Sequence, residues 1–301
     1  MPNITNTNQF YNLVPKDAKL ERLATGFTFT EGPIWNQAGK YLLFSDIPEH
    51  RRHRWDAKSG ATEVTQSSNM GNGMTYDAQG DLLVCEHATS SLVRIRPDNS
   101  HQVIANHYKG TELNSPNDVI TARDNSIFFT DPAYGRLPGF GVERVQYLKF
   151  QGFFRVQPSG ENLQLMADDF EAPNGLCFSP DESLLYVNDS TRAHIRVFEH
   201  QRDGTVANGT VFFDKIGDGD IAKGIPDGMK CDAEGNIYVT GPGGIWVISP
   251  QAELLGLIEV PENVGNLNWG GDEWKTLFIC ASTSLYKIEL NIAGNKTPYM
   301  A

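Results

Sequence analysis

Six polar residues recur at the starts of six similar segments of the chain, and each has a side-chain oxygen. They are Glu31, Asn72, Asn117, Asn174, Asp227 and Asn266, and successive members lie 41, 45, 57, 53 and 39 residues apart. If the chain gathers them, two carboxylates come together and repel one another unless a cation lies between them. Oxygen donors without cysteine or histidine select a hard divalent cation, with Ca²⁺ first and then Mg²⁺ or Mn²⁺. Zn²⁺ stays open as an alternative, although it usually takes histidine or cysteine. One such residue alone would be interpreted as a turn cap, whereas six in register favour a bound cation.

A second polar set follows the first at a constant distance. Its members lie 14 or 15 residues after a residue of the first set, and they are Asp46, His87, Asp131 and Asp189. If each segment is a hairpin, its second strand returns to the end where the first strand began. These side chains would then surround a cation, bind substrate or carry protons. The alternative is that they only cap loops.

The segments that carry these residues have the pattern of β-hairpins. NGMTYDAQGDLLVCEH from Asn72 and DGMKCDAEGNIYVTG from Asp227 each place a polar turn between two β-rich runs. A third and often a fourth β-rich run follow in the same unit, as at 92–95 and 102–104. Six four-stranded units with a period in the forties predict an all-β, six-bladed β-propeller with antiparallel blades. Because the first strand of each blade is innermost, the six starting residues are expected to ring one end of the channel.

The ends of the chain and one insertion depart from the repeat. The last unit has no clear fourth strand after Ile288, whereas residues 20–24 form a spare strand before the first unit. We therefore expect this strand to complete the last blade and close the ring. The chain 1–301 is interpreted as a single propeller domain with an N-terminal extension at 1–18. Residues 131–149 form an unusually long connection, which is expected as an insertion loop over the channel mouth.

Composition limits the classes of partner. Lys plus Arg is 25 and Asp plus Glu is 37, so the formal net charge is −12, which argues against a nucleic-acid-binding protein. No apolar run is long enough to span a membrane, and the first residues lack the order of a signal peptide. We therefore expect a cytoplasmic protein that is a monomer or weak homo-oligomer. The four cysteines lie far apart in strand-like runs and are expected to be free, buried thiols.

Several short motifs resemble one family of six-bladed propellers, the gluconolactonase/regucalcin (senescence marker protein) family. They are EGPIW at Glu31, CEH at Cys85, SPNDV at Ser115, FTDPAYG at Phe129, PNGL at Pro173 and PDGM at Pro226. The similarity extends from about Leu20 to Leu290, and CEH and TDPAYG are most similar to the bacterial gluconolactonase branch. The resemblance implies one divalent cation held by Glu31, Asn174 and Asp227. It also implies that Asp227 is the general base and that Asn117 lies near both metal and substrate.

The resulting hypothesis is metal-assisted hydrolysis of a lactone, first of all a sugar (aldono-1,5- or 1,4-) lactone. A cation polarises the carbonyl, Asn117 donates a hydrogen bond to the same oxygen, and Asp227 or His87 deprotonates water. The expected substrate contacts are Asn72, Asn117, Asp131, Tyr134 and Asn266. A GxSxG motif is absent, which argues against a serine nucleophile. The alternatives are a phosphotriester hydrolase on the same site and a non-catalytic, calcium-containing propeller that binds a small molecule or protein.

Overall fold

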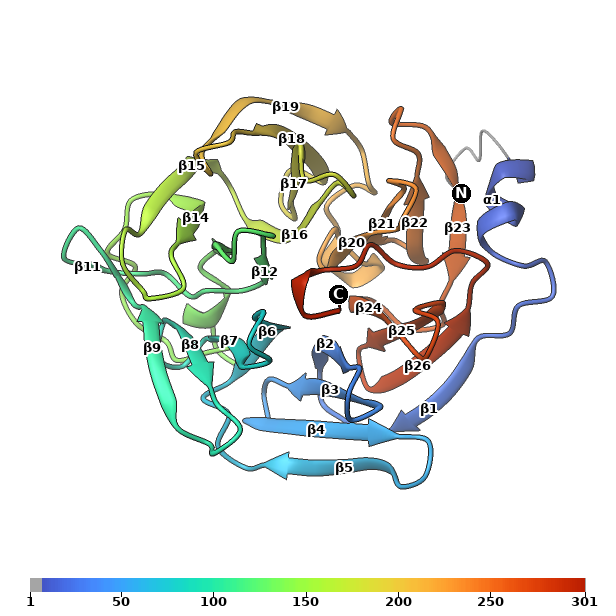
Figure 1. Cartoon of the computed structure of the whole chain (residues 1–301), viewed down its shortest axis with the longest axis horizontal. Helices are drawn as coiled ribbons and strands as arrows, with labels where there is room; N and C mark the ends of the chain where they lie inside the picture. Colours follow the sequence, from blue (N-terminus) through green and yellow to red (C-terminus); the bar gives the residue numbers. More distant parts are fainter. Residues whose placement is uncertain (1–6, 301) are drawn as a thin grey trace.

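In the computed structural model, the described residues 7–300 form six four-stranded antiparallel sheets around a central axis (Figure 1). Blades 1 to 3 consist of β2 (Thr30–Asn36), β3 (Tyr41–Asp46), β4 (Arg51–Asp56) and β5 (Gly60–Thr65); β6 (Gly71–Tyr76), β7 (Leu82–Glu86), β8 (Ser91–Ile95) and β9 (His101–Ala105); and β12 (Val119–Thr121), β13 (Ile127–Asp131), β14 (Gln151–Val156) and β15 (Gln164–Phe170). Blades 4 to 6 consist of β16 (Pro173–Phe178), β17 (Leu184–Asp189), β18 (His194–His200) and β19 (Val206–Phe213); β20 (Met229–Cys231), β21 (Ile237–Gly241), β22 (Gly244–Ile248) and β23 (Leu254–Glu259); and β24 (Val264–Gly270), β25 (Thr276–Ala281), β26 (Ser284–Glu289) and β1 (Glu21–Thr25). This confirms the predicted six-bladed β-propeller.

The first hairpin of each blade is fixed by local turn chemistry. In blade 2, the Asp77 carboxylate accepts hydrogen bonds from the backbone N–H groups of Gln79 and Asp81, at 3.0 Å each. Gly80 in the same turn has a φ of 82°, which a residue without Cβ adopts at little cost. Similar turns return each second strand to the end of the channel where the first strand began.

Both ends of the chain are tied into the ring. β1 pairs with β26 and completes the last blade, as expected from the sequence. Helix α1 (Thr7–Leu13) contacts β23, where the Phe10 ring packs on Gly256. The C-terminal segment, which ends in the 3₁₀ helix η3 (Pro298–Met300), lies over the centre of the ring (Figure 1). There, the Tyr299 ring contacts Tyr76, the last residue of β6. Because Asn72 lies near the start of β6, this segment covers the channel end opposite the predicted site.

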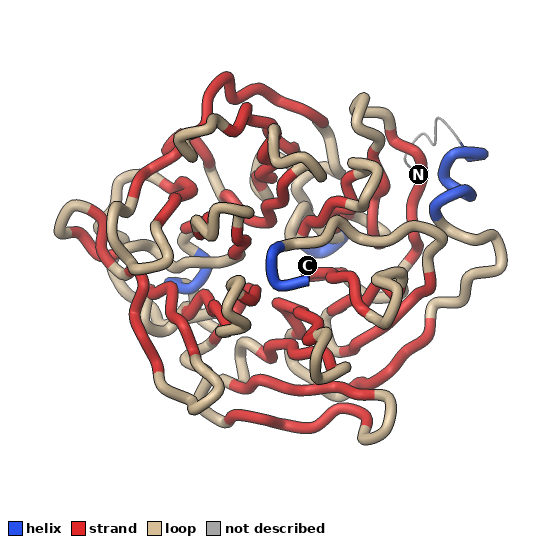
Figure 2. Tube along the Cα trace, viewed as in Figure 1, coloured by secondary structure: helices blue, strands red, loops and turns tan. Residues whose placement is uncertain are grey.

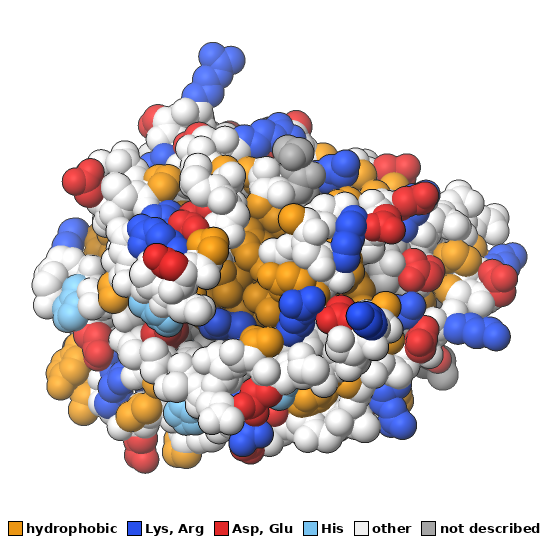
Figure 3. All heavy atoms as spheres, turned by 60° about the horizontal axis from the view of Figure 1, so that its bottom comes forward, with side chains coloured by type: hydrophobic (Ala, Val, Ile, Leu, Met, Phe, Trp, Pro, Cys, Tyr) orange, Lys and Arg blue, Asp and Glu red, His pale blue; other side chains and the backbone are white. Residues whose placement is uncertain are grey.

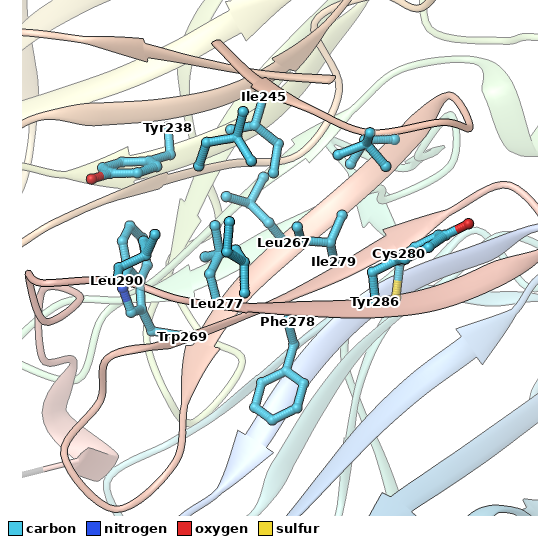
Figure 4. Close-up of a cluster of buried hydrophobic side chains, with 14 of the residues drawn as sticks. Tyr238, Ile245, Leu267, Trp269, Leu277, Phe278, Ile279, Cys280, Tyr286 and Leu290 are labelled. Carbon is cyan, nitrogen blue, oxygen red and sulfur yellow. The ribbon is translucent and has the colours of Figure 1, made fainter. Parts of the chain in front are cut away.

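The hydrophobic core lies between adjacent blades. In Figure 4, side chains of blade 5, such as Tyr238 and Ile245, face Leu267, Leu277 and Ile279 of blade 6. All five are fully buried, so each blade stabilises its neighbour rather than itself. The four cysteines are buried and free, as predicted.

The connections carry the irregular structure, which is drawn as loops in Figure 2. The insertion at 131–149 holds the 3₁₀ helix η1 (Tyr134–Arg136), and η2 (Ile221–Lys223) lies between β19 and β20. A hairpin that the sequence did not suggest, β10 (His107–Tyr108) with β11 (Thr111–Glu112), precedes blade 3.

Acidic and basic side chains are interspersed over the face in Figure 3, where a hollow has hydrophobic side chains on its floor. Among residues 7–300, no helix is long and apolar enough to cross a membrane.

Candidate active site

The structure brings seven of the predicted polar residues together around one cavity of about 230 Å³. They are Glu31, Asn72, His87, Asn117, Tyr134, Asn174 and Asp227. Five come from the starts of the first strands, one follows a second strand, and Tyr134 belongs to the insertion. The cavity therefore lies at the channel end where the first strands begin.

The starting residues enter the channel because the first strands begin irregularly. Four of the six lie within a first strand, whereas Asn117 and Asp227 precede β12 and β20 by two residues; the sequence suggested that all six would precede their strands. Pairing with the second strand shifts register next to these residues, between Glu31 and Ile34 for example. Such an irregularity turns a side chain out of the alternating pattern of the sheet. The same backbone device is thus repeated around the ring.

Glycines allow neighbouring blades to approach closely at this point. Gly73 donates its N–H to the Asn117 carbonyl at 2.9 Å, and Gly175 donates to the Asp227 carbonyl at 3.0 Å. A Cβ added to Gly175 would lie 2.2 Å from that carbonyl oxygen, a distance that no side chain could occupy. The backbones of Asn117 and Asp227 are therefore held by the blades before them.

Two carboxylates are crowded in the cavity wall. Glu31 is buried and accepts hydrogen bonds from its neighbour Gly32 N, at 2.5 Å, and from Asn266 Nδ2, at 2.9 Å. Burial, followed by repulsion from Asp118, raises the pKa of Glu31 to about 7. Burial and then the charges of Glu31 and Asp118 raise the pKa of Asp227 well above its usual range. Removing these charges or adding a positive one would relieve the repulsion.

The donor atoms around these carboxylates fit a divalent cation. Asn174 donates its Nδ2 to Ser190 Oγ at 3.1 Å, which leaves its Oδ1 available to the cavity. Asn72 Oδ1 is buried without a hydrogen-bond partner, a costly state for a polar atom. Carboxylate and amide oxygens are the ligands that Ca²⁺ prefers. No group of three or more His, Cys, Asp or Glu side chains suited to a metal exists within the described chain, so a cation here would depend on asparagine oxygens.

His87 is held as a neutral imidazole with a defined tautomer. Its Nδ1 lies 2.7 Å from the Phe140 carbonyl oxygen, which can only accept, so Nδ1 carries the proton. Its Nε2 lies 3.3 Å from Asn72 Nδ2 and accepts from it. Burial lowers the pKa of His87 to about 4. At neutral pH the imidazole is therefore uncharged, and its Nε2 lone pair accepts from the Asn72 amide beside the cavity.

Two arginines tie the insertion to the neighbouring loops. Arg136 donates to the carbonyls of Asn114, at 2.8 Å, and Leu113, at 2.6 Å, and is nearly fully buried. Arg144 donates to the carbonyls of His87, at 3.1 Å, and Ala88, at 2.7 Å. These bonds place the insertion against the loop that carries His87. The Phe140 carbonyl that fixes the imidazole therefore depends on the course of the whole insertion.

Three aspartates of the second polar set turn away from the cavity. Each accepts backbone N–H groups of the loop that leads into its own blade: Asp46 from Thr28 and Phe29, Asp131 from Asn114 and Ser115, and Asp189 from Glu171 and Ala172. This differs from the substrate contact expected for Asp131, because both of its oxygens are taken by amides at 2.8 Å. Only His87 of this set reaches the cavity.

Two further predicted residues have different surroundings. Asn266 does not line the cavity and instead supports Glu31 from behind through its side-chain amide. Tyr134 does line it, and burial, opposed by one hydrogen bond and reinforced by Asp227 and Asp189, raises its pKa to about 12. Tyr134 therefore stays a protonated hydrogen-bond donor at neutral pH.

Sequence reasoning missed a charge pair just behind the site. Asp118 follows Asn117, and its carboxylate lies 3.5 Å from Lys230 Nζ, from blade 5. In four of the other five units, the residue after the starting residue is glycine, as Gly73 is after Asn72. The aspartate in place of glycine was the signal in the sequence that marked this position as different.

The chain is similar to known proteins over most of its length. Residues 29–283 match the model of the SMP-30/Gluconolactonase/LRE-like region. A gluconolactonase of Zymomonas mobilis is 32% identical over 296 residues, which cover 91% of this chain and 82% of that protein. A crystal structure of a gluconolactonase from Xanthomonas campestris is 33% identical, with a TM-score of 0.86 over 96% of this chain and 94% of that one. A calcium-binding protein, regucalcin, from Agrobacterium tumefaciens shares the fold at 18% identity, with a TM-score of 0.78 over 94% and 98% of the two chains. The chain is therefore a member of the SMP-30/gluconolactonase/LRE family.

Proposed function

We propose that this chain hydrolyses a lactone, first of all a sugar (aldono-1,5- or 1,4-) lactone, in the cavity at the starts of the first strands. The observation that carries the proposal is the meeting of Glu31, Asp227, Asn174 and the neutral His87 around one space. The similarity to gluconolactonases over nine-tenths of the chain supports the reaction class.

Glu31, Asn174 and Asp227 would hold one divalent cation, with Ca²⁺ first because all three donors are oxygens. When bound, the cation polarises the lactone carbonyl and offsets the negative charge that forms on its oxygen. The two carboxylates supply the negative charge that balances the cation, and the charge of Glu31 already contributes to the raised pKa of Asp227.

The remaining polar side chains bind and orient the substrate. Asn117 lines the cavity, and no side-chain hydrogen bond of its amide is found within residues 7–300, so its Nδ2 is available to donate to the carbonyl oxygen. Asn72 and the Tyr134 hydroxyl donate to oxygens of the ring. Because these side chains hold the substrate in place before the reaction, less entropy is lost on reaching the transition state.

The chemical step needs one base. Asp227, or else His87 through Nε2, takes a proton from water as the water oxygen bonds to the carbonyl carbon. The tetrahedral intermediate then breaks the bond between that carbon and the ring oxygen. The base returns its proton to the departing oxygen, and the product is a hydroxy acid. A positioned base of this kind contributes about 10²–10⁴-fold.

Hydrolysis of lactones by purified protein tests the proposal. Glucono-1,5-lactone, galactono- and xylono-lactones and an aliphatic lactone are followed with a pH indicator, after chelation and after adding Ca²⁺, Mg²⁺, Mn²⁺ or Zn²⁺. Turnover that disappears on chelation and returns with a cation is the expected result. No turnover of any lactone despite cation binding would contradict it, and hydrolysis of a phosphotriester by the same protein would replace it.

A further inference from the structure

The mouth of the active-site cavity is hydrophobic, although its inner wall is polar. Seven apolar residues line it together with the polar set, and we name them the apolar collar: Phe29, Ile47, Leu137, Phe140, Ile221, Ile225 and Val264. Apart from Asp227, the starting residues are buried, and so are Ile47 and Val264 of the collar, whereas Phe140 is 38%, Leu137 50% and Ile221 70% exposed. Phe140, Leu137 and Ile221 therefore lie at the entrance, whereas Ile47 and Val264 extend the apolar surface inward beside the polar residues.

The collar is built from separate parts of the ring. Phe29 and Ile47 flank blade 1, Leu137 and Phe140 belong to the insertion, and Ile221 begins η2 between blades 4 and 5. The rings of Phe29 and Phe140 meet edge to face with their centroids 5.1 Å apart, so two of these parts touch. A single loop with a stray hydrophobic residue would not give this arrangement.

Exposed hydrophobic side chains are concentrated in these segments. Ten large hydrophobic residues are exposed among residues 7–300, and six lie in the insertion or in η2: Leu137, Phe140, Val142, Val145, Tyr147 and Ile221. Contiguous exposed apolar surface on a folded protein usually marks a binding site. Three of the six, Leu137, Phe140 and Ile221, line the cavity that holds the catalytic candidates, which points to the substrate as the molecule that covers them.

The collar has the wrong chemistry for a bare sugar. No Lys or Arg lines the cavity, and its two further polar residues, Asn263 and Ser282, already donate to backbone carbonyls of Ala222 and Asn263. A hydroxyl group placed against the collar itself loses water without gaining a hydrogen bond. An alkyl or aryl group in the same place gains free energy from burial. The deeper asparagines, Tyr134 and His87 meet the polar ring, so the two regions match two parts of one molecule.

We propose that the substrate is a lactone with an apolar arm, an alkyl or aryl substituent whose ring lies on the polar residues and whose arm fills the collar. This inference rests on the proposed lactone hydrolysis, and within that reaction it ranks a lactone with an apolar arm ahead of the unsubstituted sugar lactone. The reaction is unchanged: water adds to the carbonyl, the ring C–O bond breaks, and the hydroxy acid keeps the arm.

A ring-matched series tests the inference. The cation-loaded protein is given δ-valerolactone and 1,5-lactones with alkyl chains of two to six carbons at the ring carbon beside the ring oxygen, with glucono-1,5-lactone in parallel. We expect kcat/KM to rise about two- to fourfold per methylene until the chain outgrows the collar. Turnover of δ-valerolactone and gluconolactone with a flat or falling chain-length trend would overturn the collar while leaving lactone hydrolysis intact.

Variants locate the effect. Leu137→Ser and Ile221→Ser are each expected to lower the ratio of kcat/KM for the longest chain to that for δ-valerolactone about fivefold or more. Val211→Ser is the matched control, because Val211 is 53% exposed on β19 and does not line the cavity. Unchanged ratios in both collar variants, with melting temperatures like the parent, would argue against the inference.

A binding measurement separates the two failures. Ring-matched lactams with the same alkyl chains resist hydrolysis, and calorimetry gives their affinities directly. If no lactone is hydrolysed, the proposed function fails, and the lactam series then tests by itself whether the collar binds an apolar arm. Affinity that rises with chain length and is weakened by Leu137→Ser supports binding of the arm in the collar. Affinity that does not change with chain length overturns it.

Discussion

At the scale of single residues, the site holds two carboxylates whose ionised forms are disfavoured by burial and by neighbouring negative charge. Burial and neighbouring charge raise the pKa of Glu31 from 4.5 to about 7, so the folded chain binds more protons than the unfolded chain between these values. Its contribution therefore lowers the free energy of unfolding as pH rises through that window. His87 has the opposite sign: burial lowers its pKa from 6.5 to about 4, so it lowers stability as pH falls through that range.

Adding a cation distinguishes the contribution of Glu31 from that of His87, because the cation binds the carboxylates. We expect Ca²⁺ to raise the melting temperature of chelated protein only slightly at pH 5 and by more at pH 6 and above, because Glu31 and Asp227 both have raised pKa values and lose their protons to bind it. Glu31→Gln should abolish most of this pH dependence, whereas Glu161→Gln, at an exposed turn, should keep it. Melting curves with and without Ca²⁺ at each pH give the answer, and a Ca²⁺ effect of equal size at pH 5 and 8 would refute the role of Glu31.

The choice between the two bases is also a question for single residues. We expect Asp227→Asn, which keeps an oxygen donor, to bind Ca²⁺ more weakly and, at saturating Ca²⁺, to lose about 10²–10⁴-fold in kcat. His87→Gln should lose about tenfold or less, because an imidazole with a pKa of about 4 is a weak base at neutral pH. Kinetics of both variants with excess cation decide the matter. The reverse order of losses would assign the base to His87.

At the scale of elements, the insertion determines the state of His87. Arg144 joins the insertion to the His87 loop through two backbone carbonyls, and Phe140 fixes the protonated ring nitrogen. Loosening this contact would hydrate the imidazole and return its pKa towards 6.5, so His87 would become charged at a higher pH. The insertion thus keeps the cavity neutral at this position.

Arg144→Ala tests that dependence. We expect kcat/KM to fall by up to about fourfold at pH 6 and hardly at all at pH 8, because the acid limb of its pH profile moves upwards as the His87 pKa rises towards 6.5. Arg144→Lys should recover part of the loss through a single charged donor. Arg123→Ala, at an exposed turn of blade 3, is the control. A loss that is equal at every pH would point to a general effect on folding instead.

The same scale shows what the sequence could and could not predict. The repeat phase located the first and second strands of every blade, because hairpin turns such as Asp77–Gly80 have strong local signals. The repeat phase therefore predicted that Glu31, Asn174 and Asp227 lie at one channel end. Repeat phase alone could not separate His87 from Asp131, which occupy similar positions. Their side chains diverge because the amides of Asn114 and Ser115 capture both oxygens of Asp131.

The apolar collar and the β10–β11 hairpin could not be predicted from the sequence for a related reason. Collar residues such as Phe29, Leu137 and Ile221 come from connections with no repeat position, and only the closed ring brings them to one mouth. Hydrophobic residues in loops carry no periodic signal. Their function depends on tertiary neighbours rather than on local pattern.

At the scale of the whole molecule, the ring is closed by one short strand. β1 supplies the fourth strand of the last blade through pairs such as Thr25 with Ser284. Because each blade packs on its neighbours, a gap at one blade exposes the core on both sides. The N-terminal helix adds a separate contribution, since Phe10, Leu13 and Val14 are buried outside the blade itself.

Two truncations separate these contributions. Removing residues 1–18 takes away α1 and about 5 kcal/mol of side-chain burial, so the melting temperature should fall by about 10 °C while unfolding stays cooperative. Removing residues 1–26 also takes away β1, and we expect a further fall, a broader transition and faster proteolysis near the exposed edge of β26. Thermal melts and limited proteolysis of the two proteins provide the comparison. Equal melting temperatures for the two truncations would mean that β1 does not stabilise the closed ring. Its pairing with β26 would then add nothing to the stability that the N-terminal helix provides.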